Sequence, residues 1–295
     1  MPSPLSEQVS DFIGVRFTEV SDAGGQHGYH HLTGTLADGR AIFAKVAREP
    51  SEAFAAEANG LRWLAAADGG PPVPEVIGVS PKFLVIELVE TLSRERTPAQ
   101  AARRFGADLA RMHAAGAPSF GAPWPGYIAS LPLDNRPLDG AAPGDTNWGS
   151  WYARRRLLPY LRRARDKGAV SRAEVSLVES VIDRIGELAG PPEPPSRIHG
   201  DLWWGNVVWS GGRGWLIDPA AHGGHRETDL AMLDLFSAPE LDEILQGYTE
   251  TIPLADGWRS RVPLHQLHPL LVHVCLFGGG YSAQLAAAAR TALAS

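Results

Sequence analysis

Ile198-His-Gly-Asp-Leu-Trp-Trp-Gly-Asn-Val-Val-Trp209 is the most informative segment of the sequence. Its apolar ends are typical of short strands and its centre carries turn-forming residues, which predicts a strand, a loop and a second strand. Asp201 and Asn206 lie five positions apart in that loop, and Asp218 directly follows the apolar run Trp215-Leu-Ile217. The pattern therefore predicts two carboxylates and one amide at the ends of short apolar strands.

Phosphoryl transfer requires residues of these types. One carboxylate must orient the attacking hydroxyl and accept its proton, and oxygen ligands must hold Mg²⁺ on the nucleotide phosphates. Asp201 has the spacing of a catalytic-loop base, whereas Asn206 and Asp218 have the spacing of metal ligands. Each residue alone could simply cap a turn, but the combination between apolar strands favours an enzyme that uses ATP and Mg²⁺.

An upstream lysine and glutamate supply the cation that this chemistry also needs. Lys45 ends the apolar run Ala41-Ile-Phe-Ala-Lys45, which is similar to the lysine-bearing strand of kinases. Glu57 follows on a predicted amphipathic helix, one turn from Phe54 and from Leu61, so the helical period places it on the buried stripe. A buried glutamate needs a partner, and Lys45 is the natural one. An exposed glutamate at the helix edge is the alternative.

Two blocks of different periodicity follow one another along the chain. The predicted strands are 17–20, 29–36, 40–46, 76–79 and 83–88, with one helix over 51–67 capped by Ser51, and later helices over 98–113, 150–165 and 172–188. Asp38-Gly39 predicts a hairpin turn. The change near Glu90 predicts an α+β chain with a nucleotide-binding lobe over 1–89 and a catalytic and substrate-binding lobe over 90–295.

Each of two glycine-rich segments has two possible interpretations. Gly24 and Gly25 lie in Asp22-Ala-Gly-Gly-Gln-His-Gly-Tyr29, which could cover the phosphates because glycine lets backbone amides approach them. A plain hairpin turn explains these glycines equally well. The Pro/Gly-rich stretch 117–144 is expected to be an ordered loop that carries specificity, and a purely structural loop is the competing interpretation.

Composition excludes several classes of protein. A net charge of −6 gives no general attraction for nucleic acid. Apolar stretches such as 269–277 are too short to cross a membrane, and the N-terminus lacks the pattern of a secretory signal. The single cysteine, Cys275, excludes an intramolecular disulfide. We therefore expect a cytoplasmic monomer that binds neither nucleic acid nor membrane.

Several longer motifs resemble the fructosamine (ketosamine) kinase family, which shares the protein-kinase-like fold of aminoglycoside and choline kinases. They include Phe54-Ala-Ala-Glu-Ala-Asn-Gly-Leu, Tyr127-Ile-Ala-Ser-Leu-Pro-Leu-Asp-Asn, His199-Gly-Asp-Leu-Trp-Trp-Gly-Asn and Gly224-His-Arg-Glu-Thr-Asp-Leu-Ala-Met. The resemblance implies a small β-rich N-lobe with one helix and a larger, mostly helical C-lobe. It places adenine against backbone groups of Glu87, Leu88 and Val89.

The resemblance also implies an activity. Such an enzyme phosphorylates, with ATP, the 3-hydroxyl of a ketosamine such as fructosamine or ribulosamine, and the breakdown of the 3-phosphate frees the amine. The ketosamine could be a small molecule or a protein adduct. A kinase for an aminoglycoside, choline or another small alcohol is one alternative, and a non-catalytic kinase-like binding module is another. The chain departs from the family pattern at four positions, namely Ala129, Leu133, Trp204 and His222.

Aromatic and basic residues near the predicted base are candidates for substrate binding. Trp203 or Trp204 could pack on a sugar or pair with a protonated amine, although tryptophan is often simply buried. His222, His225 and Arg226 follow Asp218 closely, where a substrate wall or a brace for the catalytic loop would lie. Asp229 is expected to be a brace or helix cap. Among the later histidines His265, His268 and His273, zinc-ligand spacing is missing, so we expect core or groove residues.

Overall fold

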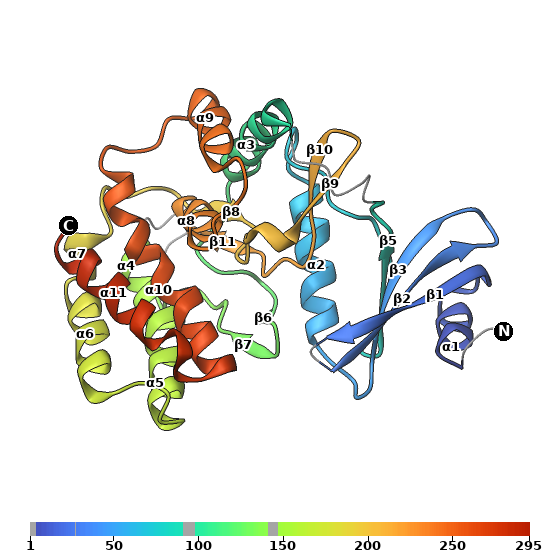
Figure 1. Ribbon diagram of the computed structural model, residues 1–295, viewed down its shortest axis with the longest axis horizontal. Helices are drawn as coiled ribbons and strands as arrows, with labels where there is room; N and C mark the ends of the chain where they lie inside the picture. The colour runs from blue at the N-terminus through green and yellow to red at the C-terminus, as the bar shows by residue number, and fades with distance from the viewer. Residues whose placement is uncertain (1–3, 27, 91–97, 141–146) are drawn as a thin grey trace.

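The N-terminal part of the chain is an antiparallel sheet with a helix on each side. The computed structural model describes residues 4–26, 28–90, 98–140 and 147–295. The strand order is β1-β2-β3-β5-β4, and Figure 1 shows α1 and α2 beside this sheet. The elements are α1 (Pro4–Ile13), β1 (Phe17–Gln26), β2 (Tyr29–Leu36), β3 (Ala41–Ala47), α2 (Ala53–Ala65), β4 (Val76–Val79) and β5 (Phe83–Glu87).

Local signals in the sequence correctly predict much of this sheet. Asp38-Gly39 forms the β2–β3 turn, with Gly39 at a φ of 87° and the Leu36 N–H donating to the Arg40 carbonyl. Helix α2 begins two residues after the predicted cap, and the Ser51 hydroxyl still accepts a bond from the Ala53 N–H at 3.2 Å. Helix α1 was not predicted.

Strand β1 is longer than the sequence predicts. It pairs with β2 from Phe17 to Gln26, with an irregularity between Asp22 and Gly25. Residues 22–26 are therefore the end of a long hairpin rather than a separate loop. Gly25 is required there, because an added Cβ would lie 2.4 Å from the Tyr29 carbonyl oxygen.

The remainder of the described chain is mostly helical. Two of the predicted helices are interrupted, the first by a π-helical turn and the second by a break at Arg184. The helices are α3 (Ala99–Ala114), α4 (Trp148–Tyr152), η1 (Ala153–Leu157), α5 (Leu158–Asp166), α6 (Arg172–Asp183), α7 (Ile185–Leu188), η2 (Trp204–Asn206), α8 (Glu227–Leu235), α9 (Leu241–Thr251), α10 (Trp258–Phe277), η3 (Gly279–Tyr281) and α11 (Ser282–Leu293).

Three short antiparallel strand pairs lie among these helices. They are β6 (Gly126–Ile128) with β7 (Leu131–Leu133), β8 (Ser196–Ile198) with β11 (His222–Gly224), and β9 (Val207–Ser210) with β10 (Arg213–Leu216). The predicted strand-loop-strand unit is thus β8, the loop with η2, and β9. The expected specificity loop contains the β6–β7 hairpin, which points toward α2 (Figure 1).

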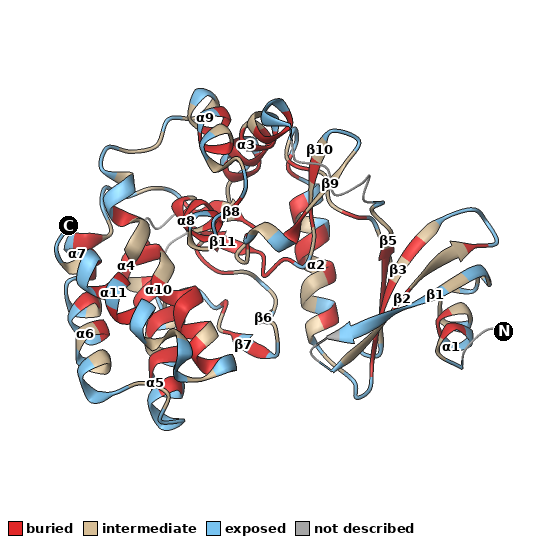
Figure 2. Cartoon of the chain, in the orientation of Figure 1, coloured by how far each residue is buried: buried red, intermediate tan, exposed pale blue. Residues whose placement is uncertain are grey.

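Buried apolar residues form clusters in both parts of the molecule, and a further cluster, which contains Leu64 of α2 and Leu109 of α3, joins the two parts. One cluster lies between α1 and the sheet, a second between α2 and the sheet, and the largest joins α4, α5, α6, α10 and α11. Figure 2 shows these buried faces turned inward in both parts. We propose the lobe boundary at residues 89 and 90, because the sheet ends with β5. Within the described ranges, no helix is long and apolar enough to span a bilayer.

Candidate active site

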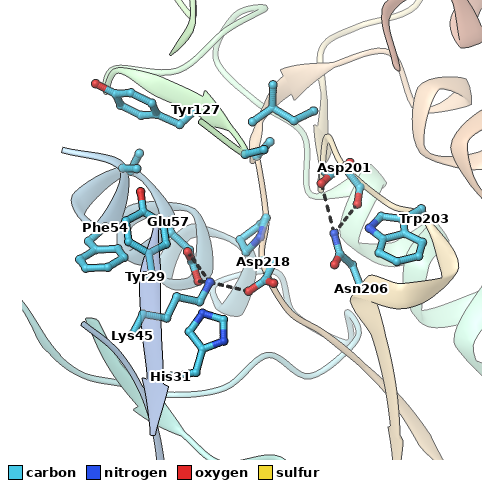
Figure 3. Close-up of a pocket in the computed structure, with 16 residues that line it drawn as sticks. Tyr29, His31, Lys45, Phe54, Glu57, Tyr127, Asp201, Trp203, Asn206 and Asp218 are labelled. Atoms are coloured by element: carbon cyan, nitrogen blue, oxygen red, sulfur yellow. Dashed lines mark hydrogen bonds and ion pairs between the residues drawn. The ribbon is translucent and has the colours of Figure 1, made fainter. Parts of the chain in front are cut away.

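One cleft collects the five residues that the sequence singled out for phosphoryl transfer. It has a volume of about 180 Å³ and lies between the N-terminal sheet with α2 and the loop after β8 (Figure 3). Its lining includes Lys45, Glu57, Asp201, Asn206 and Asp218. Residues far apart in sequence therefore reach a common space.

Lys45 is the centre of a buried charge network. Its Nζ lies 2.8 Å from both carboxylate oxygens of Glu57 and 2.7 Å from Oδ1 of Asp218. Burial alone would lower the pKa of Lys45, but the two carboxylates outweigh burial and raise the pKa above its ordinary value. Lys45 is therefore a fixed positive charge. The helical stripe of α2 explains the pair, since it turns Glu57 toward β3 in register with the buried Phe54 and Leu61.

Asp201 and Asn206 are joined within the loop after β8. The Asn206 amide nitrogen donates to the Asp201 backbone carbonyl at 2.8 Å and to Asp201 Oδ2 at 3.3 Å. The amide oxygen of Asn206 is thereby turned away from Asp201. Burial, together with the Asp218 carboxylate, raises the pKa of Asp201 to about 7. A carboxylate with this pKa can accept a proton near neutral pH, as a general base must.

Asp218 and Asn206 offer the oxygen ligands that Mg²⁺ prefers. Asp218 Oδ1 is bonded to Lys45, and the side chain is 47% exposed, so the carboxylate also faces the cleft. The residue has a φ of 53°, a left-handed conformation that costs a non-glycine residue about 1–2 kcal/mol. Strained backbone of this kind is concentrated at functional sites. The residues present therefore fit a magnesium ion.

His199 links the loop that carries Asp201 to the strand end that precedes Asp218. The sequence did not predict this role. Its Nε2 donates to the Ile217 carbonyl at 2.9 Å, so its Nδ1 is free to accept the Asp201 N–H at 3.2 Å. The ring is fully buried and neutral, since burial lowers its pKa. The position of His199 directly before Gly200-Asp201 was the available signal in the sequence.

Gly200 shows why arginine, found at this position in protein kinases, is absent here. It has a φ of 82°, and an added Cβ would lie 2.4 Å from the Ala220 carbonyl oxygen. The loop therefore passes too close to the segment after Asp218 for any side chain. This close approach keeps the proposed base and the proposed metal ligands together.

Asp229 braces the catalytic loop, as expected. Its carboxylate accepts the backbone N–H groups of His199 at 2.7 Å and Gly200 at 2.9 Å. His113 adds a ring nitrogen 3.1 Å from the same carboxylate and a second bond of 2.8 Å to the Tyr248 hydroxyl. His113 belongs to α3 and Tyr248 to α9, so tertiary packing brings both residues to Asp229.

The two tryptophans of the loop have different surroundings. Trp203 is 40% exposed and lines the cleft, and Figure 3 shows it beside Asp201 and Asn206. Trp204 instead packs against the buried cluster that contains Leu64 and Leu109. We therefore correct the prediction for Trp204, which is a packing residue, and keep Trp203 as the substrate candidate.

His222, His225 and Arg226 do not reach the cleft, so the expected substrate wall is wrong. The His222 ring packs on Trp151, with centroids 5.5 Å apart, and its Nδ1 donates to the Ala220 carbonyl. Arg226 forms a two-bonded ion pair with Glu193, and His225 lies 3.8 Å from the same carboxylate. These side chains stabilise the segment behind the cleft, because β11 turns them into the C-terminal core.

Buried His222 predicts a loss of stability in acid. Burial and the nearby Arg156 cation lower the pKa of His222 to about 3. Between about pH 3 and the ordinary histidine value near 6.5, only the unfolded chain binds this proton. The contribution of neutral, buried His222 to the stability of the folded state is therefore complete above pH 6.5 and decreases as the pH falls.

At pH 5.5 the loss from His222 should be about 1.4 kcal/mol relative to high pH. Urea unfolding of the wild type and of His222→Phe at pH 7.5 and 5.5 measures it. The variant should lose less stability between the two pH values by about that amount. An identical pH dependence in the two proteins would contradict the prediction.

Two further predicted nucleotide-binding segments are the glycine-rich end of β1 and residues 87–89 at the end of β5. Gly24 and Gly25 lie at the end of β1 and do not line the described cleft, although Tyr29 and His31 of β2 do. The N–H groups of Glu87 and Leu88 already donate to the carbonyls of Glu75 and Ala41. Of the three residues predicted to contact adenine, Val89 is therefore the one whose N–H could donate to the base.

Most departures from the family pattern alter the interior rather than the cleft. Leu133 belongs to the largest buried cluster, and Trp204 and His222 are packed as described above. Ala129 alone lines the cleft, with a φ of 50° that glycine would adopt without strain. Ala129 is thus the departure that can directly affect the substrate.

The Glu227 carboxylate of α8 lies near His265. The spacing of residues in the sequence does not predict this proximity. Ligand atoms of His225, Glu227 and His265 lie within 4.8 Å of one another. Glu227, however, is bonded to the Arg261 guanidinium at 2.9 and 2.6 Å. The buried Glu227–Arg261 ion pair therefore neutralises this carboxylate.

Comparisons with known proteins agree with the geometry. The sequence model of the family described as "Fructosamine kinase" matches residues 5–295. The "Probable ketoamine kinase" of Klebsiella aerogenes is 32% identical over 282 residues, which cover 93% of this chain and 92% of that protein. A crystal structure from Thermobifida fusca YX-ER1, described as a "putative fructosamine-3-kinase", is 49% identical, with a TM-score of 0.91 and 99% of each chain covered.

More distant structures establish the fold. A macrolide 2'-phosphotransferase from Brachybacterium faecium has a TM-score of 0.61 at 16% identity, with 96% of each chain covered. The expected α+β, protein-kinase-like fold is confirmed. With its motifs, its cleft and a family match over nearly all its residues, the chain belongs to the fructosamine kinase family.

Proposed function

We propose that this member of the family transfers the γ-phosphate of ATP to the 3-hydroxyl of a ketosamine, as a deglycation activity that acts on sugar–amine adducts. The chain is an ATP-dependent kinase by its family. The observation that supports phosphoryl transfer is the meeting of Lys45, Glu57, Asp201, Asn206 and Asp218 at one cleft, and the family match supports a ketosamine as the acceptor. The same observation disfavours a non-catalytic binding module, in which residues of this set are commonly lost.

Each of the five side chains has a distinct task in the proposed reaction. Asp201 orients the acceptor hydroxyl and takes its proton as the oxygen attacks the γ-phosphorus. Lys45, held by Glu57, binds the α- and β-phosphates. Asn206 and Asp218 would hold Mg²⁺, which neutralises charge on the phosphates when bound.

The Lys45–Asp218 ion pair couples nucleotide binding to the metal site. Lys45 donates two of its bonds to Glu57 and one to Asp218. A phosphate oxygen that takes over the third bond would release Asp218 Oδ1 for the metal. Glu57 would keep the ammonium in place during this exchange, which explains why a carboxylate is buried on α2.

A substrate panel with coupled ADP detection tests the proposal. Fructosyl and ribulosyl adducts of a simple amine should release ADP in an ATP- and Mg²⁺-dependent manner, whereas an aminoglycoside, a macrolide and choline should not. Phosphorylation of one of these alcohols with both ketosamines inert would refute the proposal. We further propose that the enzyme is a monomer in the cytoplasm, a reducing compartment that suits its single, buried Cys275.

A further inference from the structure

A second cavity adjoins the cleft on the acceptor side. It has a volume of about 360 Å³ and lies between the catalytic loop and the C-terminal end of α10. Four residues line both spaces, namely Ile128, Ala129, Asp201 and Trp203. The cavity, which we call the acceptor groove, is therefore continuous with the position of the proposed base.

Aromatic rings form a connected wall along this groove. The Trp203 and Phe236 ring centroids lie 6.1 Å apart, and those of Phe236 and His273 lie 5.2 Å apart. His273 then contacts Phe277 at 5.5 Å and Tyr281 at 4.8 Å. The wall begins beside the catalytic loop and ends at η3, so it can hold a substituent that extends away from the reacting hydroxyl.

Exposure of two of these rings is unusual for the chain. Among the described residues, Trp203 at 40% and Phe277 at 62% are the large hydrophobic side chains that are exposed. Both line the acceptor groove. Exposed apolar side chains that are scattered singly over a surface are normal, whereas neighbouring ones indicate a binding site.

The charge of the groove restricts what it can bind. Asp201 is its charged lining residue, and the other lining residues are apolar, aromatic or, in His273, an imidazole. His273 Nδ1 donates to the Pro269 carbonyl at 2.8 Å, so in the neutral ring Nε2 is an acceptor. A carboxylate in the groove would meet Asp201 and no described lysine or arginine. A protonated amine next to Trp203 would instead be favoured by Asp201 and by the indole face.

We propose that the acceptor groove binds the amine-borne part of the ketosamine, and that this part is an apolar and preferably aromatic group. This inference rests on the proposed function. The sugar would lie at Asp201, the secondary ammonium beside Trp203, and the substituent against Phe236, His273 and Phe277. The groove is large enough, since a buried apolar cavity of about 150 Å³ accommodates benzene.

Three acceptors with one sugar test the inference on the wild-type enzyme. They are the fructosyl adducts of benzylamine, ethylamine and glycine. The benzylamine adduct should have a kcat/KM about tenfold or more above that of the ethylamine adduct, mainly through KM, because the ring adds binding that is uniform along the reaction. The glycine adduct should be the poorest acceptor, since its carboxylate enters a groove without a cation.

Phe277→Ala removes the most exposed ring of the wall. Because Phe277 contributes little buried packing, the variant should fold with an unchanged Tm. It should raise KM for the benzylamine adduct by about tenfold and leave the ethylamine adduct within about twofold. Glu179→Ala, at an exposed position of α6 outside the groove, is the control and should change the KM of neither adduct.

The outcomes separate this inference from the proposed function. Equal kcat/KM for the three adducts, or an equal effect of Phe277→Ala on all of them, would overturn the groove assignment while the kinase activity stands. Failure of all three adducts to accept phosphate would refute the proposed function and the inference with it.

Discussion

Asp201→Asn should lower kcat by about 10³ and leave the affinity for ATP nearly unchanged. Asparagine keeps the shape of the side chain and can still bond to Asn206, but it cannot accept the proton of the acceptor hydroxyl. The loop would be preserved, because the Asp229 brace bonds to the backbone of His199 and Gly200 rather than to the Asp201 side chain.

A coupled ADP assay measures kcat for this variant, and calorimetry measures ATP binding. Asp242→Asn is the matched control, since Asp242 is exposed on α9 and should be neutral in both measurements. A near-normal kcat in Asp201→Asn would remove this residue from the mechanism.

Asp218→Asn should also lower kcat/KM by about 10³, for a different reason. The substitution removes the charged oxygen ligand from the proposed magnesium site, so the Mg²⁺ concentration for half-maximal activity should rise. It also frees Lys45 from one carboxylate. Binding of ATP without metal should therefore be equal to or tighter than in the wild type, because less negative charge faces the phosphates.

Titration of activity with Mg²⁺, and ATP binding in the presence of a chelator, distinguish this variant from Asp201→Asn. The exposed Asp68, which does not line the cleft, offers the control Asp68→Asn. An unchanged Mg²⁺ dependence with normal turnover in Asp218→Asn would show that the metal is held elsewhere.

Features with a local cause could be predicted from the sequence. The Asp38-Gly39 turn follows from two residues that tolerate positive φ, and the Glu57–Lys45 pair follows from helical periodicity on α2. The spacing of Asp201, Asn206 and Asp218 predicted their common cleft. In each case the residues lie on elements that are consecutive in the sequence.

Features that depend on distant packing could not be predicted in this way. His222 and Arg226 lie close to Asp218 in sequence, but β11 directs them into the C-terminal core toward Trp151 and Glu193. Phe277 was part of an apolar run with no visible link to the loop at Trp203. Their meeting at one groove results from the position of α10, which the sequence alone does not specify.

The position of the phosphate on the product distinguishes the proposed reaction from phosphorylation of another hydroxyl. Wild-type enzyme, ATP, Mg²⁺ and a fructosyl-amine are combined, and the product is examined by ³¹P NMR with correlation to the sugar protons. We predict a phosphomonoester on oxygen 3 that declines as free amine appears, and that Asp201→Asn forms it about 10³-fold more slowly. A phosphate on another oxygen, or the same 3-phosphate formed at the wild-type rate by Asp201→Asn, would contradict the account.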